Sequence, residues 1–452
     1  MPKREVMSPP QRLNDDVVTE MLEYLPEGTY RFFGGVSKQF RYAHLRCLQL
    51  PAATKFEESV RSLERAMIWF HEDQEKHEIG RLGVFVRYGV RYGNVAFLVW
   101  LFDDIAAQST ANRHSLEESF HLDALCYMAS LHGQWHALKW LRSQDPPCPW
   151  NTFTCSAAAL GGHLAILKWL RSQDPPCPWN EETCSRAARN GHLKVLVWAR
   201  SQDPPCPWSV LTCIRAAGNR HLDILEWLRS QHPPCPWNVM TCYEAARNGH
   251  LDIMKWLRSQ DPPCPWNEET CTTAALNGHL VLLKWLRRQD SPCPWNEETC
   301  ASAAARGHLE VLKWLRSQDP PCRWNEETCT EAARNGHLEV LKWLGSQDPP
   351  CPWDEETCNE AAGNGHLEVL KWLRSRDPPC PWDKETCNEA AINGHLETLR
   401  WLQSLDPTCP WYEETWAAIY GHLDVLGWLR CQDLPCPWDE DACTGTGLVE
   451  RL

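Results

Sequence analysis

The sequence predicts an all-α solenoid of about twelve two-helix units, preceded by a small N-terminal helical domain. The main observation is a 29-residue period, marked by a connector tryptophan that recurs from Trp150 to Trp411. A second tryptophan series recurs at the same spacing from Trp140 to Trp401. Fixed periods of about 20 to 50 residues indicate a repeat array, in which each unit buries its apolar face against its neighbours.

The first helix of each unit is expected to begin directly after the connector tryptophan. The residue there is Asn, Ser or Asp, as at Asn296 and Asp354, with Tyr412 as the exception. Their short side chains can accept a hydrogen bond from the free amides of a first helical turn. Two glutamates often follow, which favours the positive end of the helix dipole. The helix should end at Asn-Gly, because glycine can adopt the left-handed conformation of a helix terminus.

The second helix is expected in the segment Gly-His-Leu-Glu-Val-Leu-Lys-Trp-Leu, residues 336–344 in one copy. Its apolar residues recur at spacings that form one broad face. The following Asp-Pro-Pro should end the helix, since proline lacks the amide hydrogen. Each unit therefore contains two helices of about ten residues and a proline-rich connector.

The composition of the chain excludes some classes of ligand. Lys plus Arg total 45 against 59 Asp plus Glu, a formal charge of −14, and no basic stripe is visible. We therefore expect no nucleic acid ligand and favour a protein partner with a basic surface. The chain has no apolar run of about 18 residues and no apolar signal segment near Met1, so we expect no membrane partner and a soluble, intracellular protein of the cytoplasm or nucleus.

The 24 cysteines follow the repeat, mostly as one in the connector and one seven residues later in the first helix, as at Cys264 and Cys271. In a long chain without an export signal, we expect buried, reduced thiols. A zinc site is the alternative, but structural zinc sites use shorter ligand spacings such as Cys-x2-Cys. The recurring His of Gly-His-Leu, such as His279, is expected to be a hydrogen-bonded helix-start residue. No catalytic residue, metal or cofactor is expected, and the chain should not be an enzyme.

Residues 328–344 read Thr-Cys-Thr-Glu-Ala-Ala-Arg-Asn-Gly-His-Leu-Glu-Val-Leu-Lys-Trp-Leu. This pattern resembles the ankyrin repeat, and the resemblance extends over residues 93–443. Two departures are visible: the unit is shorter than the family's 33 residues, and Asp-Pro-Pro-Cys-Pro-Trp stands where the family has a β-hairpin. We therefore expect the hairpin tips, through which that family often contacts partners, to be missing.

The copies differ most at the two positions between the helix cysteine and Ala-Ala and at the position after Ala-Ala. In ankyrin arrays the first helices line the concave face, so the resemblance implies that these side chains contact a partner. Unconstrained drift on a solvated face is the alternative. The candidate partner-binding residues are Ser185, Arg186, Arg189, Ile214, Arg215, Tyr243, Glu244, Arg247, Thr272, Thr273, Thr330, Glu331, Arg334, Asn388 and Glu389.

Residues 13–50 form a different kind of segment, with apolar residues at helical spacing and a Pro-Glu-Gly break. The segment resembles an F-box, although Asn14 stands where that family has proline and Phe40 where it has tryptophan. The resemblance implies docking onto a Skp-type adaptor and a role as the substrate receptor of a Skp-cullin-F-box ubiquitin ligase. The alternative is a helical cap on an ankyrin-repeat scaffold with no ubiquitin role. The candidate adaptor-binding residues are Leu13, Asp16, Leu22, Leu25, Val36 and Phe40.

The expected organisation follows from these patterns. It comprises a disordered tail at 1–12, the F-box-like domain at 13–50, a helical linker at 51–92, the ankyrin-like solenoid at 93–443 and a C-terminal tail at 444–452.

Overall fold

The computed structural model describes residues 89–93, 95, 98–99, 122–405, 422, 424–425 and 428. Contacts between residues divide the chain into two compact units, Met1–Thr183 and Cys184–Leu452. The expected tails, the F-box-like segment and nearly all of the linker lie outside the described residues.

Residues 122–405 form ten successive helix pairs, and no strand occurs between these residues. This confirms the all-α solenoid, while the expected units before and after these ten lie largely outside the described residues. The first helices of the pairs are α8 (Leu122–Leu131), α10 (Thr152–Leu160), α12 (Glu181–Arg189), α14 (Val210–Gly218), α16 (Val239–Arg247), α18 (Glu268–Leu276), α20 (Glu297–Ala305), α22 (Glu326–Arg334), α24 (Glu355–Gly363) and α26 (Lys384–Ile392). The second helices are α9 (Trp135–Arg142), α11 (Leu164–Arg171), α13 (Leu193–Arg200), α15 (Leu222–Ser230), α17 (Leu251–Ser259), α19 (Leu280–Arg287), α21 (Leu309–Arg316), α23 (Leu338–Gly345), α25 (Leu367–Arg374) and α27 (Leu396–Leu405).

The first helices begin where the sequence predicts. Asn296 is the N-cap of α20, and it forms a reciprocal capping box with Thr299 at the third helical position. The backbone amide of Asn296 donates to Oγ1 of Thr299 at 3.3 Å. Asp354 and Thr357 repeat this arrangement at α24. Because the threonine is fully buried, the cap is part of the packed interior.

The turn between the two helices uses a residue with positive φ. Gly307 has φ 72° after α20, as expected for a glycine at a helix terminus. After α14, Arg220 stands at the corresponding position with φ 63°. A residue with a Cβ atom, such as arginine, is strained at positive φ, whereas glycine is not.

The second helices end before they reach the prolines that were expected to end them. Helix α21 ends at Arg316, three residues before Asp319. The side chains of Ser317 and Gln318 donate to the carbonyl oxygen of Trp314 at 2.8 and 3.0 Å. Side chains of the connector thus satisfy a carbonyl of the last turn, and the helix ends before proline forces it to. Typical first and second helices contain nine and eight residues.

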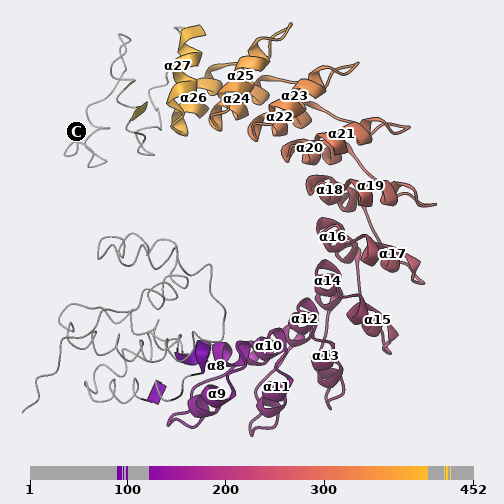
Figure 1. The fold of residues 1–452 in the computed structure, drawn as a ribbon, viewed down its shortest axis with the longest axis vertical. Coiled ribbons are helices and arrows are strands. Elements are labelled where there is room, and N and C mark those ends of the chain that lie inside the picture. The colour runs from indigo at the N-terminus through magenta and orange to yellow at the C-terminus, as the bar shows by residue number, and fades with distance from the viewer. Residues whose placement is uncertain are drawn as a thin grey trace, which may run out of the picture. The chain divides into compact units, whose positions relative to one another are not determined.

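The interior has small residues on one side and large residues on the other. Helix α20 buries Cys300, Ala303 and Ala304, whereas α21 buries Val311, Leu312 and Leu315. Small side chains allow successive first helices to pack closely, and neighbouring pairs such as α20 with α22 are in extensive contact. Within the second unit, the row of pairs curves with the even-numbered helices on its inner side (Figure 1).

The cysteines connect neighbouring repeats. Sγ of Cys271 donates to the carbonyl oxygen of Cys293 at 3.8 Å, and Sγ of Cys293 donates to the carbonyl oxygen of Asn267 at 3.3 Å. The hydrogen bond with Cys271 and burial raise the pKa of the Cys293 thiol. Among the described cysteines, 18 are free and buried. The expectation of reduced thiols is wrong at Cys387, which is disulfide-bonded.

Candidate functional site

The variable positions lie on the first helices, on the inner side of the curved row in the second unit (Figure 1). The caps, the buried interior and the connectors are nearly constant, whereas the first turn of the first helix and the second position of the second helix also vary, as at Val281 and Glu310. We call the accessible variable side chains of α12 to α26 the first-helix face. Its members among the predicted residues are half-buried or exposed, namely Arg186, Arg189, Ile214, Arg215, Tyr243, Glu244, Arg247, Thr272, Glu331, Arg334, Asn388 and Glu389.

Three predicted partner-binding residues are not part of this face. Ser185, Thr273 and Thr330 are 0, 3 and 2% exposed. Oγ of Ser185 accepts a hydrogen bond from Nη1 of Arg215 at 3.2 Å. Oγ1 of Thr330 lies 3.1 Å from Oγ1 of Thr357 in the next first helix. These side chains occupy the packing between neighbouring helices, so a partner cannot contact them in this arrangement.

An ion-pair network crosses one repeat boundary on the face. Nε of Arg334 lies 2.8 Å from Oε2 of Glu360, and its Nη2 donates to Oε1 at 2.8 Å. Arg334 also pairs with Glu331 on its own helix. Glu360 was not among the predicted residues. The sequence could have identified it, because Glu360 stands two residues after Cys358, just as the predicted Glu331 stands two residues after Cys329.

The charge of the face changes sign along the second unit. Arg186, Arg189 and Arg215 lie on α12 and α14, whereas Glu360 and Glu389 lie on α24 and α26. At the acidic end, burial and the carboxylates of Glu360, Glu385 and Glu356 raise the pKa of Glu389. Burial also raises the pKa of Glu331, where Arg334 acts in the opposite direction. The face therefore presents basic and acidic regions to a partner.

The recurring histidines connect repeats. Nε2 of His337 lies 3.1 Å from the carbonyl oxygen of Ala305, and Nε2 of His366 lies 3.0 Å from that of Arg334. The prediction that these residues are hydrogen-bonded is confirmed, and the acceptor is the end of the first helix in the preceding repeat. Among the described residues, no group of three His, Cys, Asp or Glu side chains is placed to hold a metal ion.

The six candidate adaptor-binding residues, Leu13, Asp16, Leu22, Leu25, Val36 and Phe40, lie outside the described residues. A membrane-spanning helix is not found in the described part of the chain, where none is long and apolar enough.

The fold and the first-helix face define a helical repeat protein. The family described as "Ankyrin repeats (many copies)" matches residues 300–344, a span that runs from within α20 into α23. The ankyrin resemblance thus has independent support in that part of the array. The family match does not extend to residues 13–50, where the F-box resemblance was seen.

No curated protein matches the chain significantly, whereas 82 chains of known structure do. Two are crystal structures of the pentatricopeptide repeat protein PPR10 in complex with an 18-nt psaJ RNA element, one with cysteine-to-serine substitutions. Each is 13% identical, with a TM-score of 0.38, and the match covers 93% of this chain and 74% of that chain. A likeness at this level says nothing about what this chain binds.

Proposed function

We propose that the chain is a protein-binding repeat scaffold that captures its partner along the first-helix face. One observation carries the proposal: side-chain chemistry varies on this face, while the caps, interior and connectors hardly vary. Side chains that are half-buried on closely packed helices are held by their neighbours, as Arg334 is by Glu360. A preorganised polar surface loses less conformational entropy on binding.

The partner is a folded protein or peptide with a basic region that faces α24 and α26. The chain carries a formal charge of −14, and Glu360 and Glu389 lie at the acidic end of the face. Complementary charge would speed association and select among partners. The same charge disfavours a nucleic acid backbone. The chain itself performs no chemistry in this proposal, and it acts in the cytoplasm or nucleus.

Affinity purification of the tagged full chain, followed by mass spectrometry, identifies candidate partners. Two double variants then test the face: Arg186→Glu with Arg215→Glu at the basic end, and Glu360→Lys with Glu389→Lys at the acidic end. Each should weaken capture of a direct partner by at least about tenfold, as expected for several lost charge contacts. Nuclease treatment distinguishes a protein partner from bound RNA.

The matched control is Lys313→Glu with Lys342→Glu. These lysines are exposed on second helices, where they pair with Glu310 and Glu339 at 2.7 Å. Circular dichroism should show unchanged helicity for all variants. Equal loss of capture in the control and in the face variants would refute the proposal.

We further propose, from the F-box resemblance of residues 13–50, that the captured protein is presented to a Skp-cullin-F-box ubiquitin ligase. The test is binding of a purified Skp-type adaptor to the full chain. An F-box docks through an apolar face, so Leu25→Asp should abolish adaptor binding and spare capture of the array's partner. If the wild-type chain does not bind the adaptor, the protein is a scaffold without a ubiquitin role.

A further inference from the structure

The connectors and second helices form a regular aromatic ladder. From Trp150 to Trp324, each connector tryptophan lies against an arginine of the preceding second helix, and most of them also pack on a tryptophan of the following one. Trp353 lacks the arginine, because Gly345 stands at that position. For Trp324, the guanidinium of Arg316 lies 3.8 Å from the ring centroid, and Trp343 packs edge-to-face at 6.0 Å. From Arg142 to Arg316, the seven arginines of this ladder lie 3.8 to 4.1 Å from their tryptophan rings.

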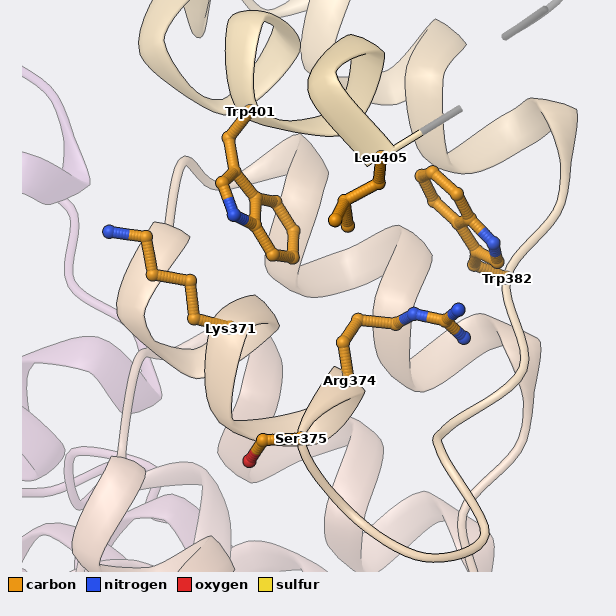
Figure 2. A pocket seen from close by; sticks show the side chains of 6 residues that line it. All are labelled: Lys371, Arg374, Ser375, Trp382, Trp401 and Leu405. Carbon is orange, nitrogen blue, oxygen red and sulfur yellow. The ribbon is translucent and has the colours of Figure 1, made fainter. Parts of the chain in front are cut away.

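The ladder is interrupted between α25 and α27. Arg374 lies 5.2 Å from the centroid of Trp382. The expected edge-to-face contact of Trp382 with Trp401 does not occur among the described residues, although the preceding pair, Trp353 and Trp372, makes it at 5.9 Å. Figure 2 shows the two indoles of Trp382 and Trp401 apart, with Leu405 between them.

Leu405 is a departure from the repeat. It is the fourth residue after the second-helix tryptophan, a position that holds Gln in the eight repeats from Gln144 to Gln347. The side chain of Gln347 donates to the carbonyl oxygen of Trp343 at 3.0 Å. Leucine cannot make this bond, and Leu405 is instead 49% exposed among the aromatic rings.

The interruption leaves an open pocket of about 530 Å³. Its lining consists of Lys371, Arg374, Ser375, Trp382, Trp401 and Leu405. Trp382, Trp401 and Leu405 supply apolar surface to the pocket, and Lys371 and Arg374 supply two positive charges. No carboxylate residue belongs to the lining. Nη1 of Arg374 donates to the carbonyl oxygen of Cys380 at 2.7 Å, and this is the one hydrogen bond of its side chain to the described residues. Lys371 pairs with the surface residue Glu368 at 2.7 Å.

We propose that this pocket binds a large apolar side chain flanked by carboxylates, presented by a segment of a partner protein. The two indoles and Leu405 would contact the apolar side chain, and Arg374 and Lys371 would pair with the carboxylates. The pocket is open, whereas sites for small molecules bury about 70 to 90% of their ligand, so a side chain anchored by its own polypeptide fits better. The site lies on connectors and second helices, and it is separate from the first-helix face.

The charge of the chain makes the test selective. At a formal charge of −14, the protein repels acidic peptides in general, so their binding requires a local cationic site. The probe is a fluorescein-labelled peptide, Gly-Ser-Glu-Phe-Glu-Ser, measured by fluorescence anisotropy with the full chain. Two comparison peptides replace both Glu by Lys, or Phe by Ala.

We expect saturable binding of the Glu-Phe-Glu peptide and at least tenfold weaker binding of both comparison peptides. Arg374→Gln should weaken binding at least tenfold by removing the cation. Leu405→Gln should have the same effect, because it restores the residue of the regular ladder and lets the indoles close the pocket. The matched control Arg316→Gln, at a closed position of the ladder, should leave binding unchanged.

Three outcomes would overturn the proposal: no saturable binding up to about 1 mM, equal binding of the Lys-Phe-Lys peptide, or equal loss in Arg316→Gln and Arg374→Gln. Melting curves check that each variant is folded. Since Leu405→Gln introduces the residue common to eight repeats, we expect its melting temperature to match that of the wild-type chain.

Discussion

Nε2 of His366 lies 3.0 Å from the carbonyl oxygen of Arg334, the last residue of α22. The last carbonyls of a helix have no partner within the helix. In this array, a histidine from the next repeat supplies a donor for one of them. The imidazole therefore stabilises the packing of one repeat against the preceding one.

This relationship predicts loss of stability in mild acid. Burial lowers the pKa of His250, His308 and His366 from the usual 6.5. Below pH 6.5 the unfolded chain takes up protons at these residues before the folded chain does. Stability should therefore fall as the pH decreases from 6.5 through the folded pKa values, and this contribution should be constant below them. The melting temperature should be lower at pH 5.5 than at pH 7.5.

The double variant His308→Gln with His366→Gln provides the control, because glutamine can still donate to the carbonyl but does not titrate in this range. Its melting temperature should depend less on pH. The raised pKa values of Glu331 and Glu389 act in the opposite direction, since their stabilising effect appears as the pH falls toward the unfolded value. An unchanged acid-induced drop in the double variant would show that other groups cause it.

Replacing Arg220 by glycine should stabilise the protein. Arg220 has φ 63°, where glycine stands in the neighbouring repeats, as at Gly249. Relief of the left-handed strain is worth about 1 to 2 kcal/mol. The ion pair that is lost, Arg220 with Asp252 at 3.0 Å, is exposed and should contribute less than about 1 kcal/mol. Urea unfolding of Arg220→Gly and Asp252→Asn measures the two effects separately, and a less stable Arg220→Gly variant would contradict this account.

The arginine–tryptophan stack should contribute measurably to stability. Arg287 lies 3.9 Å from the ring centroid of Trp295, and its Nη1 donates to the carbonyl oxygen of Cys293 at 2.6 Å. Arg287→Ala should cost about 1 to 2 kcal/mol by urea unfolding, from the lost cation–π contact and hydrogen bond. The neighbouring Arg288 is exposed, so Arg288→Ala should change stability by less than about 0.5 kcal/mol. Similar effects of the two changes would rule out a special role for the stack.

The buried cysteines should behave as interior side chains. Cys271→Ala and Cys300→Ala should each cost about 1 to 2 kcal/mol by loss of packing. Both side chains are fully buried and free, and the hydrogen bond with Cys322 together with burial raises the pKa of the Cys300 thiol. A thiol reagent should label them only after denaturation. Rapid labelling of the native protein, or a large drop in melting temperature with a metal chelator, would contradict structural packing.

Much of the array could be predicted from the sequence because each unit repeats the same local signals. Asn296 after the connector tryptophan marks a helix start, and Gly307 marks the turn between helices, since caps and positive-φ residues act over a few residues. The residues that end the second helices were predicted wrongly: Asp-Pro-Pro was expected to end them, whereas Gln318 and Ser317 satisfy the carbonyl of Trp314 before Pro320 is reached. Whether these side chains reach the carbonyl depends on the geometry of the turn, which the sequence pattern does not give.

The sequence alone determined the repeat, its period, the order of its two helices and the positions that vary, because these depend on local spacing. Only the tertiary structure decided which variable side chains are accessible. Ser185 and Arg186 are neighbours in the sequence, yet packing against the next helix buries the first and leaves the second half-exposed. It also decided that Arg334 pairs with Glu360 and that Leu405 separates two indoles. Contacts of this kind join residues of different helices, such as Arg334 and Glu360, which are 26 positions apart, and their distances depend on how one repeat packs against the next.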